Sequence, residues 1–364
     1  MRMRRLAIGL ALLVGGAGPE PPQAAVSVRE DGTVLVGGEA FFPLGLVHVS
    51  SAGDRARRSG DLQMIAVGGF NVMQAVLQPG DKDFLDEAEG LGIRVLAEAA
   101  DTEGLKAAVK ELKGKGAILA WNLAEDADNG RRFPAELARL NREIKALDPG
   151  HPTYLTCGDL EHCGKFLELS DLVGLKSLPL PSGNLGGPAD LFRAAERAAG
   201  EGRRGFLAVI QAWAPKGKPA PSPEEVRNMT YQALVHGARG ILFHAYFDRD
   251  WDLGTQTELW NEIRVIASEI QSLRPALLEG KRQRLETKAS DVHAAAWPHK
   301  GRIYLAAVNV FPEPRKVMIR LPAEAAGAGR PQFRIPPRKL ALEGSVLVGE
   351  MGAREVQVLL FESR

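Results

Sequence analysis

Carboxylate, amide and aromatic side chains follow a series of short apolar runs along this 364-residue chain. Acids can transfer protons, amides and carboxylates can hold hydroxyl groups, and an aromatic ring can cover the apolar side of a sugar. We therefore expect a carbohydrate site. Its catalytic candidates are Asp126, Glu125 and Glu98, and its substrate-binding candidates are His48, Gln74, Asp159, Lys176, Gln211, Trp213, His244, Tyr246 and Asp248.

These candidates lie near the ends of apolar runs that are rich in β-branched residues. Eight such runs alternate with helix-like segments, at residues 42–49, 70–76, 93–99, 118–123, 153–156, 172–178, 206–212 and 240–246. Eight βα units in about 240 residues are typical of an α/β fold of the TIM (β/α)8 barrel type, whose active sites lie at the carboxyl ends of the strands. A doubly wound open sheet is the alternative, but no glycine-rich phosphate loop follows the first run.

The segments between the runs carry signals of helices that pack on an outer ring. Ser222-Pro223-Glu224-Glu225 combines a capping serine, a proline in the first turn and a glutamate that closes a capping box. Apolar side chains then recur at helical spacing, at Val226, Met229, Ala233 and Leu234.

All-β segments flank the predicted barrel. Two short runs, at 26–28 and 33–36, surround Asp31-Gly32 and predict a hairpin that covers the barrel floor. After the last helix, short runs at 292–297, 303–309, 316–321, 340–342 and 356–361 predict a β-sandwich. The predicted organisation is a signal peptide and leader at 1–25, the hairpin and barrel at 26–280, and the sandwich at 281–364. Because the sandwich has few clustered aromatic residues, we expect it to stabilise the barrel rather than bind sugar.

The N-terminus has the features of a secretory signal peptide. Arg2, Arg4 and Arg5 precede the apolar run 6–14, which is too short to span a bilayer. Cleavage after Ala17 or near Ala25 would release a secreted or periplasmic protein, and the lack of a cysteine after the run argues against a lipid anchor. A cytoplasmic protein with a chance apolar N-terminus is the alternative.

Charge and cysteine content limit the partners and cofactors. The chain has 46 Lys and Arg against 45 Asp and Glu, a net charge of +1, so we expect no nucleic-acid partner and no membrane association after signal cleavage. A neutral carbohydrate fits better. Cys157 and Cys163 can form a small disulfide, which the sequence leaves open. His151, His162 and Cys163 match no familiar zinc spacing, so we expect neither a metal nor another cofactor.

Four stretches together resemble bacterial barrel proteins related to clan A glycoside hydrolases. They are residues 118–128, 148–152, 209–213 and 229–243, and the resemblance extends over roughly residues 26–364. It implies that Asp126 occupies the position of the proton donor, or Glu125 if the register slips by one. It also places Gln211 where the clan carries its nucleophilic glutamate, and an amide cannot form the same glycosyl ester.

The resemblance also shows where this chain departs from the family. Ala127 replaces a proline after the acidic pair, and Lys176 and Leu178 stand where relatives often carry an acid and a tyrosine. Lys176 can pair with Asp126 or Glu125 and make either a poorer acid. The preferred hypothesis is a glycoside hydrolase with Asp126 or Glu125 as general acid and a partner among Glu98, Asp159 and Asp248.

Simpler structural roles compete with these functional ones. A non-catalytic carbohydrate-binding barrel that lost its nucleophile is the main alternative function, and a barrel enzyme of another class is a third, because a fold does not fix a function. Asp128 and Asp159 can cap helices. His48 and His244 can be wall residues, Trp213 and Trp251 can pack a lid, and Trp121 is expected in the core.

Overall fold

The computed structural model describes residues 25–49, 55–159, 161–181, 184–199, 205–325, 332–333 and 340–362. The predicted signal peptide, up to residue 24, lies outside the described residues. Within them, no helix combines the length and the apolar character needed to cross a bilayer.

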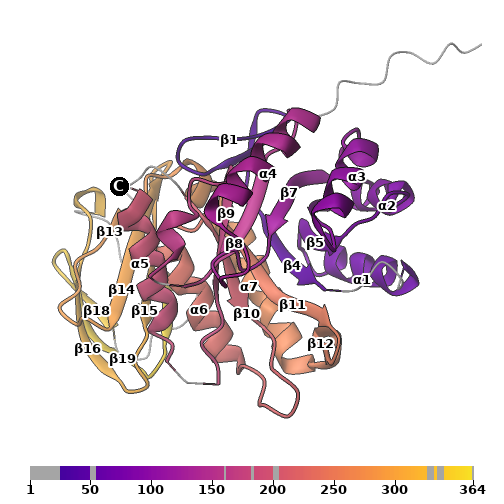
Figure 1. Ribbon diagram of the computed structural model, residues 1–364. Helices are drawn as coiled ribbons and strands as arrows, with labels where there is room; N and C mark the ends of the chain where they lie inside the picture. The colour runs from indigo at the N-terminus through magenta and orange to yellow at the C-terminus, as the bar shows by residue number, and fades with distance from the viewer. Residues whose placement is uncertain are drawn as a thin grey trace, which may run out of the picture.

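Eight parallel strands close into a barrel, which confirms the predicted fold (Figure 1). The strands are β4 (Leu44–His48), β5 (Val72–Val76), β6 (Arg94–Glu98), β7 (Ile118–Ala124), β8 (Thr153–Cys157), β9 (Leu172–Ser177), β10 (Leu207–Gln211) and β11 (Gly240–Asp248). Each pairs with its neighbour in chain order, and β11 pairs with β4 to close the ring. The closure rules out the doubly wound open sheet.

Helices follow most of the strands and bury one apolar face against the barrel. They are α1 (Arg55–Val67), α2 (Lys82–Gly90), α3 (Thr102–Leu112), α4 (Pro134–Leu147), α5 (Gly187–Ala199), α6 (Pro223–Val235) and α7 (Thr257–Glu279). Among the described residues, β8 is followed only by the short 3-10 helix η1 (Cys163–Lys165), and β11 by strand β12 (Trp251–Asp252) and the 3-10 helix η2 (Leu253–Thr255). The capping box predicted at Ser222 begins α6, with Ser222 and Glu225 exchanging two hydrogen bonds.

A three-stranded antiparallel sheet covers the amino-terminal end of the barrel, and two of its strands form the predicted hairpin, while the third was not predicted. It consists of β1 (Val26–Val28), β2 (Val34–Val36) and β3 (Glu39–Phe41). Val26 and Val34 are buried in the same apolar cluster as the barrel interior. Gly32 adopts φ +79°, and a Cβ there would lie 2.5 Å from the backbone of Gly205, so the turn approaches the barrel too closely for a side chain.

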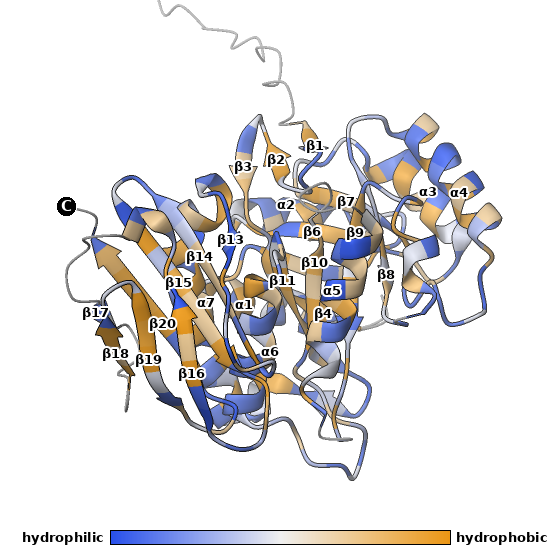
Figure 2. Cartoon of the chain, turned by 90° about the vertical axis from the view of Figure 1, so that its left-hand side faces the viewer, coloured by the Kyte–Doolittle hydropathy of each residue, from blue (hydrophilic) through white to orange (hydrophobic). Residues whose placement is uncertain are grey.

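Two antiparallel sheets follow the barrel (Figure 2). One contains β13 (Gln283–Arg284), β14 (Val292–His299), β15 (Arg302–Asn309), β17 (Gln332–Phe333) and β20 (Val356–Glu362), and the other contains β16 (Arg315–Arg320), β18 (Leu340–Glu343) and β19 (Val346–Met351). A short 3-10 helix, η3 (Ala323–Ala325), follows β16. The five-stranded sheet packs one face on the second sheet and the other on α6 and α7. The sequence did not predict β13, β17 or β19, because two of them have only two residues and Gly349 interrupts the third.

A buried ion pair fixes the loop between β5 and α2. Arg58 Nη2 lies 2.8 Å from Asp81 Oδ1, and the two side chains are only 2% and 1% exposed. Arg58 also donates to the carbonyl of Val76, and Asp81 accepts from the backbone N–H of Gln78. The pair therefore connects α1 to the carboxyl end of a barrel strand.

Replacing Arg58 by Met should lower the free energy of unfolding by about 3–5 kcal/mol, because the change leaves the charge of Asp81 buried without its partner. Lys82→Ala removes the exposed ion pair with Glu111 and should cost less than about 1 kcal/mol. Urea denaturation of both variants measures the difference. Equal losses in the two variants would contradict a structural role for the buried pair.

Candidate functional site

A polar layer lies directly above the apolar interior of the barrel. Side chains on one face of a strand recur every two residues. The residue two positions after each apolar interior residue therefore points to the same side, one layer higher. Val72, Leu96, Ala120, Tyr154, Val209 and Leu242 belong to that interior cluster, and two residues further on lie Gln74, Glu98, Asn122, Thr156, Gln211 and His244. Lys176 pairs with the inward-facing Val209 across β9 and β10, and its ammonium group reaches Glu125 beside this layer. The layer occupies the carboxyl ends of the strands, where barrel enzymes carry their active sites.

One amide holds two carboxylates together in this layer. Gln74 Nε2 donates to Glu98 Oε2 at 3.1 Å and to Glu125 Oε1 at 2.7 Å. The three residues come from β5, the end of β6 and the loop after β7, which are neighbours in the barrel. The shared amide brings both acids to a single point on the rim.

Glu125 accepts hydrogen bonds on both of its carboxylate oxygens. Oε1 accepts from Gln74 and from Asn122 Nδ2 at 3.0 Å, and Oε2 accepts from Thr156 Oγ1 at 3.2 Å and Lys176 Nζ at 3.3 Å. An ionised carboxylate is an acceptor only, so this arrangement of four donors matches the charged form. The side chain of Glu125 is still 25% exposed.

Lys176 forms the ion pairs that the sequence predicted. Its ammonium group lies 3.3 Å from Glu125 and 3.1 Å from Asp126, and its side chain is only 9% exposed. Burial opposes the charged form, but the carboxylates of Glu125 and Asp126 outweigh it and raise the pKa of Lys176. The lysine therefore stays charged beside the two acids.

Glu98 has the opposite electrostatic environment. Burial, followed by the negative charge of Glu125, raises the pKa of Glu98 to about 7. The hydrogen bond from Gln74 and the charge of Lys176 act in the other direction. Glu98 and Glu125 thus form a pair of acids with different surroundings, which is the usual basis for dividing acid and base roles.

Two further polar groups line the interior below and beside the acids. Burial, followed by the charge of Glu125, raises the pKa of Tyr154 well above its ordinary value, so the phenol stays protonated. Burial and the charge of Lys176 lower the pKa of His244 to about 3. His244 and Tyr154 are therefore both neutral. The charged groups of this layer are the two glutamates and the lysine.

A hollow of about 270 Å³ opens beside the acids. Glu98, Asn122 and Glu125 line it on one side, and Asn129, Arg131 and Arg132 from the loop after β7 line it on the other. Arg132 is held by the hydroxyl of Thr102 at 3.0 Å. The hollow gives a small polar ligand access to both carboxylates.

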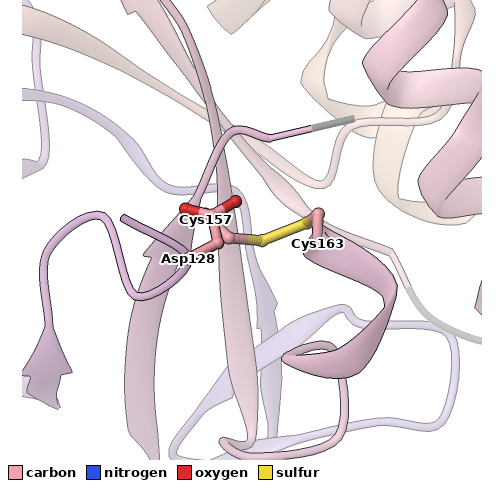
Figure 3. Close-up of side chains that lie close together, drawn as sticks. All are labelled: Asp128, Cys157 and Cys163. Atoms are coloured by element: carbon pink, nitrogen blue, oxygen red, sulfur yellow. A yellow bond between two sulfur atoms is a disulfide. The ribbon is translucent and has the colours of Figure 1, made fainter. Parts of the chain in front are cut away.

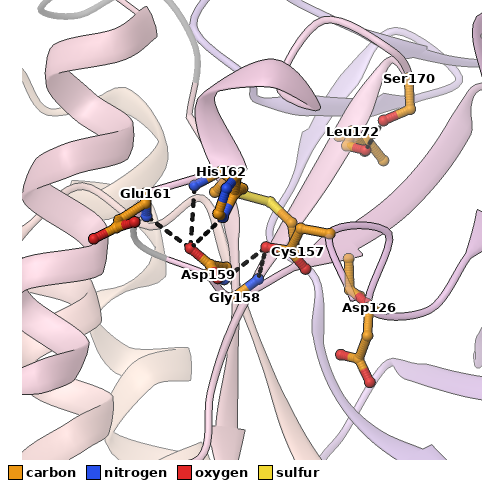
Figure 4. Close-up of a disulfide and its surroundings, with 11 residues drawn as sticks. Asp126, Cys157, Gly158, Asp159, Glu161, His162, Ser170 and Leu172 are labelled. Atoms are coloured by element: carbon orange, nitrogen blue, oxygen red, sulfur yellow. Dashed lines mark hydrogen bonds and ion pairs between the residues drawn. A yellow bond between two sulfur atoms is a disulfide. The ribbon is translucent and has the colours of Figure 1, made fainter. Parts of the chain in front are cut away.

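Asp126 lies at the edge of the site rather than inside it. Its backbone has φ 46°, its N–H donates to Thr156 Oγ1 at 2.7 Å, and its side chain is 46% exposed. Figure 4 shows its carboxylate pointing away from the disulfide. Its carboxylate pairs with Lys176, so Asp126 contributes charge beside Glu125 without entering the Gln74 bridge.

Other predicted residues lie away from the two acids. Gln211 is buried, and its amide binds only backbone: it accepts from Leu180 N–H at 2.9 Å and donates to the carbonyls of Leu180 and Trp213. Trp213 packs edge-on against His244, with ring centroids 6.1 Å apart. The amide of Gln211 therefore holds the loop after β9.

A second set of polar and aromatic side chains lies on another part of the rim, around His48. His48 Nε2 lies 2.8 Å from Asp61, and its ring packs near Phe247 and Tyr246. Burial, followed by the charges of Asp61 and Asp252, raises the pKa of Tyr246 to about 12. Asp248 accepts from the N–H of Arg249 in the turn to β12. None of these residues contacts Glu98 or Glu125 in the described part of the chain.

A disulfide and two capping acids organise the loop after β8. Cys157 and Cys163 are bonded, as Figure 3 shows, so a pairing that the sequence left open is present. The nearby Asp128 accepts from the N–H groups of Gly158 and Asp159, and Asp159 accepts from those of Glu161 and His162 (Figure 4). Both acids therefore cap this loop. With its cysteines bonded to each other, the Asp128–Cys157–Cys163 group has no thiolate for a metal.

Sequence reasoning missed Asn122 and Thr156, although both donate to Glu125. They lie within the predicted strands rather than after their ends. The period of two would have found them, because each follows an interior apolar residue by two positions. Trp121, predicted in the core, is fully buried, and its indole N–H donates to Asp148.

Comparison with known proteins agrees with the fold. No protein-family model and no curated protein sequence matches this chain. The α-amylase from Geobacillus thermoleovorans, solved in complex with acarbose, is similar with a TM-score of 0.60 at 10% identity, over 89% of this chain and 98% of that one. A cyclomaltodextrinase gives 0.59 at 10%, over 88% and 77%. A GH30 endoxylanase from Clostridium papyrosolvens C71 gives 0.51 at 11%, over 94% and 98%. The chain thus shares the barrel of glycoside hydrolases.

Two substitutions should move the pKa of Glu98 in opposite directions. Glu125→Gln removes a negative neighbour and should lower the pKa below 7, whereas Lys176→Met removes a positive neighbour and should raise it. NMR titration of 13C-labelled glutamate carboxyls measures both shifts. Glu103→Gln, on the outer surface of α3, is the matched control. Shifts of the same sign in the two test variants would refute the described geometry.

Proposed function

We propose that the protein hydrolyses a glycosidic bond in a carbohydrate, with Glu98 as proton donor and Glu125 as its ionised partner. The observation that carries this proposal is the Gln74 amide, which binds one oxygen of each acid. A protonated acid and an ionised one at the mouth of the same hollow are the two groups that glycoside hydrolysis requires. The barrel shared with amylases and a xylanase supports the reaction class.

The close approach of the two acids favours a retaining mechanism. The two oxygens lie 3.1 and 2.7 Å from one nitrogen. They are therefore closer together than the roughly 6.5–9.5 Å that an inverting pair needs to hold a water molecule between the two acids. Glu98 would protonate the leaving oxygen while a carboxylate oxygen of Glu125 bonds to the anomeric carbon. Water would then attack that carbon, giving its proton to Glu98 and releasing Glu125.

This assignment moves the acid from Asp126 or Glu125, as the sequence suggested, to Glu98. Glu125 and Asp126 both pair with the ammonium group of Lys176, whereas Glu98 forms no ion pair with Lys176 among the described residues and has a pKa raised to about 7. The absence of a glutamate at position 211 does not prevent this mechanism, because Glu125 supplies the nucleophilic carboxylate.

We also propose that the protein is exported, as its N-terminal sequence predicts. The bonded Cys157 and Cys163 support this location, because structural disulfides persist mainly in oxidising compartments. Secretion to the periplasm or the medium would place the barrel where polysaccharides are available.

A carbohydrate-binding barrel without turnover is the second candidate. Two observations favour it: Gln211 uses its amide to hold a loop, and Lys176 neutralises the acids after β7. In that case the hollow would bind a sugar, and Glu98 and Glu125 would serve only as hydrogen-bonding groups.

Hydrolysis assays on the purified full chain separate the two candidates. The substrates are 4-nitrophenyl α- and β-glycosides and a panel of soluble polysaccharides. Glu98→Gln and Glu125→Gln should each lower kcat by at least about 10²-fold, because each removes a group that acts on protons or on the anomeric carbon. Glu103→Gln should keep full activity. Sugar binding by calorimetry without turnover of any substrate would favour the second candidate.

The pH profile of kcat/KM tests the role of Glu98. A general acid must be protonated to act, so activity should fall as the pH rises through about 7, the pKa of Glu98. Lys176→Met should shift this alkaline limb to higher pH, since loss of the positive charge raises the pKa. An alkaline limb that stays in place in Lys176→Met, or that persists in Glu98→Gln, would exclude Glu98 as the acid.

A further inference from the structure

A large cavity lies where the barrel meets the C-terminal sheets, away from the polar rim. It measures about 480 Å³ and is lined by Arg193 of α5, His236 at the end of α6, Arg284 of β13, Ser290 of the following loop and His293 of β14. A second hollow of about 460 Å³ shares Arg193 and Arg284 with it and adds Arg197. Figure 1 shows α5 beside β13 and β14.

We propose that this junction binds a tetrahedral oxyanion, a phosphate or sulfate group carried on a sugar. The site is separate from the proposed glycosidase centre and does not depend on it.

The two hollows are lined by three arginines and two acids, Asp190 and Glu286, so positive charge is in excess. Arg193 and Arg197 lie one turn apart on α5, and Arg284 faces them from β13. Arg193 pairs with Asp190, but neither Arg197 nor Arg284 forms an ion pair with any described residue. Like charges at this spacing repel each other. An anion that enters between them would remove that repulsion and accept their hydrogen bonds.

A histidine pair forms the inner wall of the cavity. His236 Nε2 lies 3.0 Å from His293 Nδ1, and His236 is only 3% exposed. The other ring nitrogen of His236, Nδ1, is buried and has no hydrogen-bond partner among the described residues.

Burial, together with the nearby arginines, keeps both imidazoles neutral. Burial, followed by Arg193 and Arg284, lowers the pKa of His293 to about 4, while Asp190 and a backbone hydrogen bond to Ser290 act in the other direction. Burial, followed by His293 and the nearby arginines, lowers the pKa of His236 to about 2. Glu286 is the other acid that lines the cavity. A bound anion should offset the positive charge of the arginines at His293 and so raise the pKa of its imidazole.

The arrangement of donors selects the class of anion. The lining includes arginines from α5 and β13, Ser290 from the loop before β14, and His293 from β14. Oxygens of a tetrahedral group point in three directions, whereas a carboxylate is planar and has two. The volume is in the range of small-molecule sites and exceeds that of a free ion, so a sugar ester fits better.

Calorimetry on the full chain at low salt tests the proposal, with inorganic phosphate, inorganic sulfate, glucose 6-phosphate, glucose 6-sulfate and glucuronate as probes. We expect the esters to bind more tightly than the free ions and glucuronate to bind at least tenfold more weakly than the esters. Arg284→Gln should weaken binding of the esters at least tenfold. Arg320→Gln, an exposed arginine on β16, is the matched control and should bind as the wild type does.

NMR of His293 supplies a readout that does not depend on heats of binding. A bound dianion should raise the pKa of His293 above 4, so binding takes up a proton in the pH range between the free and bound values. Arg284→Gln should lose this anion-induced shift while remaining folded, as its spectrum would show. No binding of any probe, equal binding of glucuronate, or an unchanged His293 shift in Arg284→Gln would each overturn the proposal.

Discussion

The structure of the site depends on one amide that holds two carboxylates. Burial, and after it the repulsion between two negative charges within reach of one nitrogen, raises the pKa of Glu98 to about 7. Gln74 donates to both acids, so the pair is connected without a third charge between them. Lys176 forms its ion pairs with Glu125 and Asp126 and, among the described residues, none with Glu98.

The barrel provides the geometry that this interaction requires. β5, β6 and β7 are consecutive in the ring, so residues at the same height on them lie side by side. The pairing of β7 with β8 is irregular between Asn122 and Ala124. This irregularity precedes Glu125, and such breaks in a ladder redirect the side chains near them. Strand order and one local irregularity together bring the two acids to a single hollow.

Much of this arrangement follows from the sequence, and some of it does not. All eight barrel strands, the floor hairpin and the pairing of Lys176 with the acids could be predicted, because they depend on local patterns and charge. The choice of Glu98 as the partner of Glu125 over Asp159 and Asp248 could not, since it depends on strand register around the ring. Asp159 shows the difference: residue type allowed either a catalytic or a capping role, and in the structure its carboxylate caps a local turn.

The amide of Gln211 illustrates the same limit. Its place at the end of β10 predicted contact with a ligand, and the structure uses it to bind the backbone of Leu180 and Trp213. Residue type and position indicate which groups are available at the rim. The loops decide which of those groups are free to meet a substrate.

Infrared spectroscopy of the carboxyl groups tests the central claim most directly, because it distinguishes a protonated acid from an ionised one in the protein without substrate. The account predicts a protonated carboxyl band at pH 6 that disappears near pH 7, is absent in Glu98→Gln and is present in Lys176→Met. A band that survives in Glu98→Gln and is lost in Glu125→Gln would show that the proton resides on the other acid and would contradict the account.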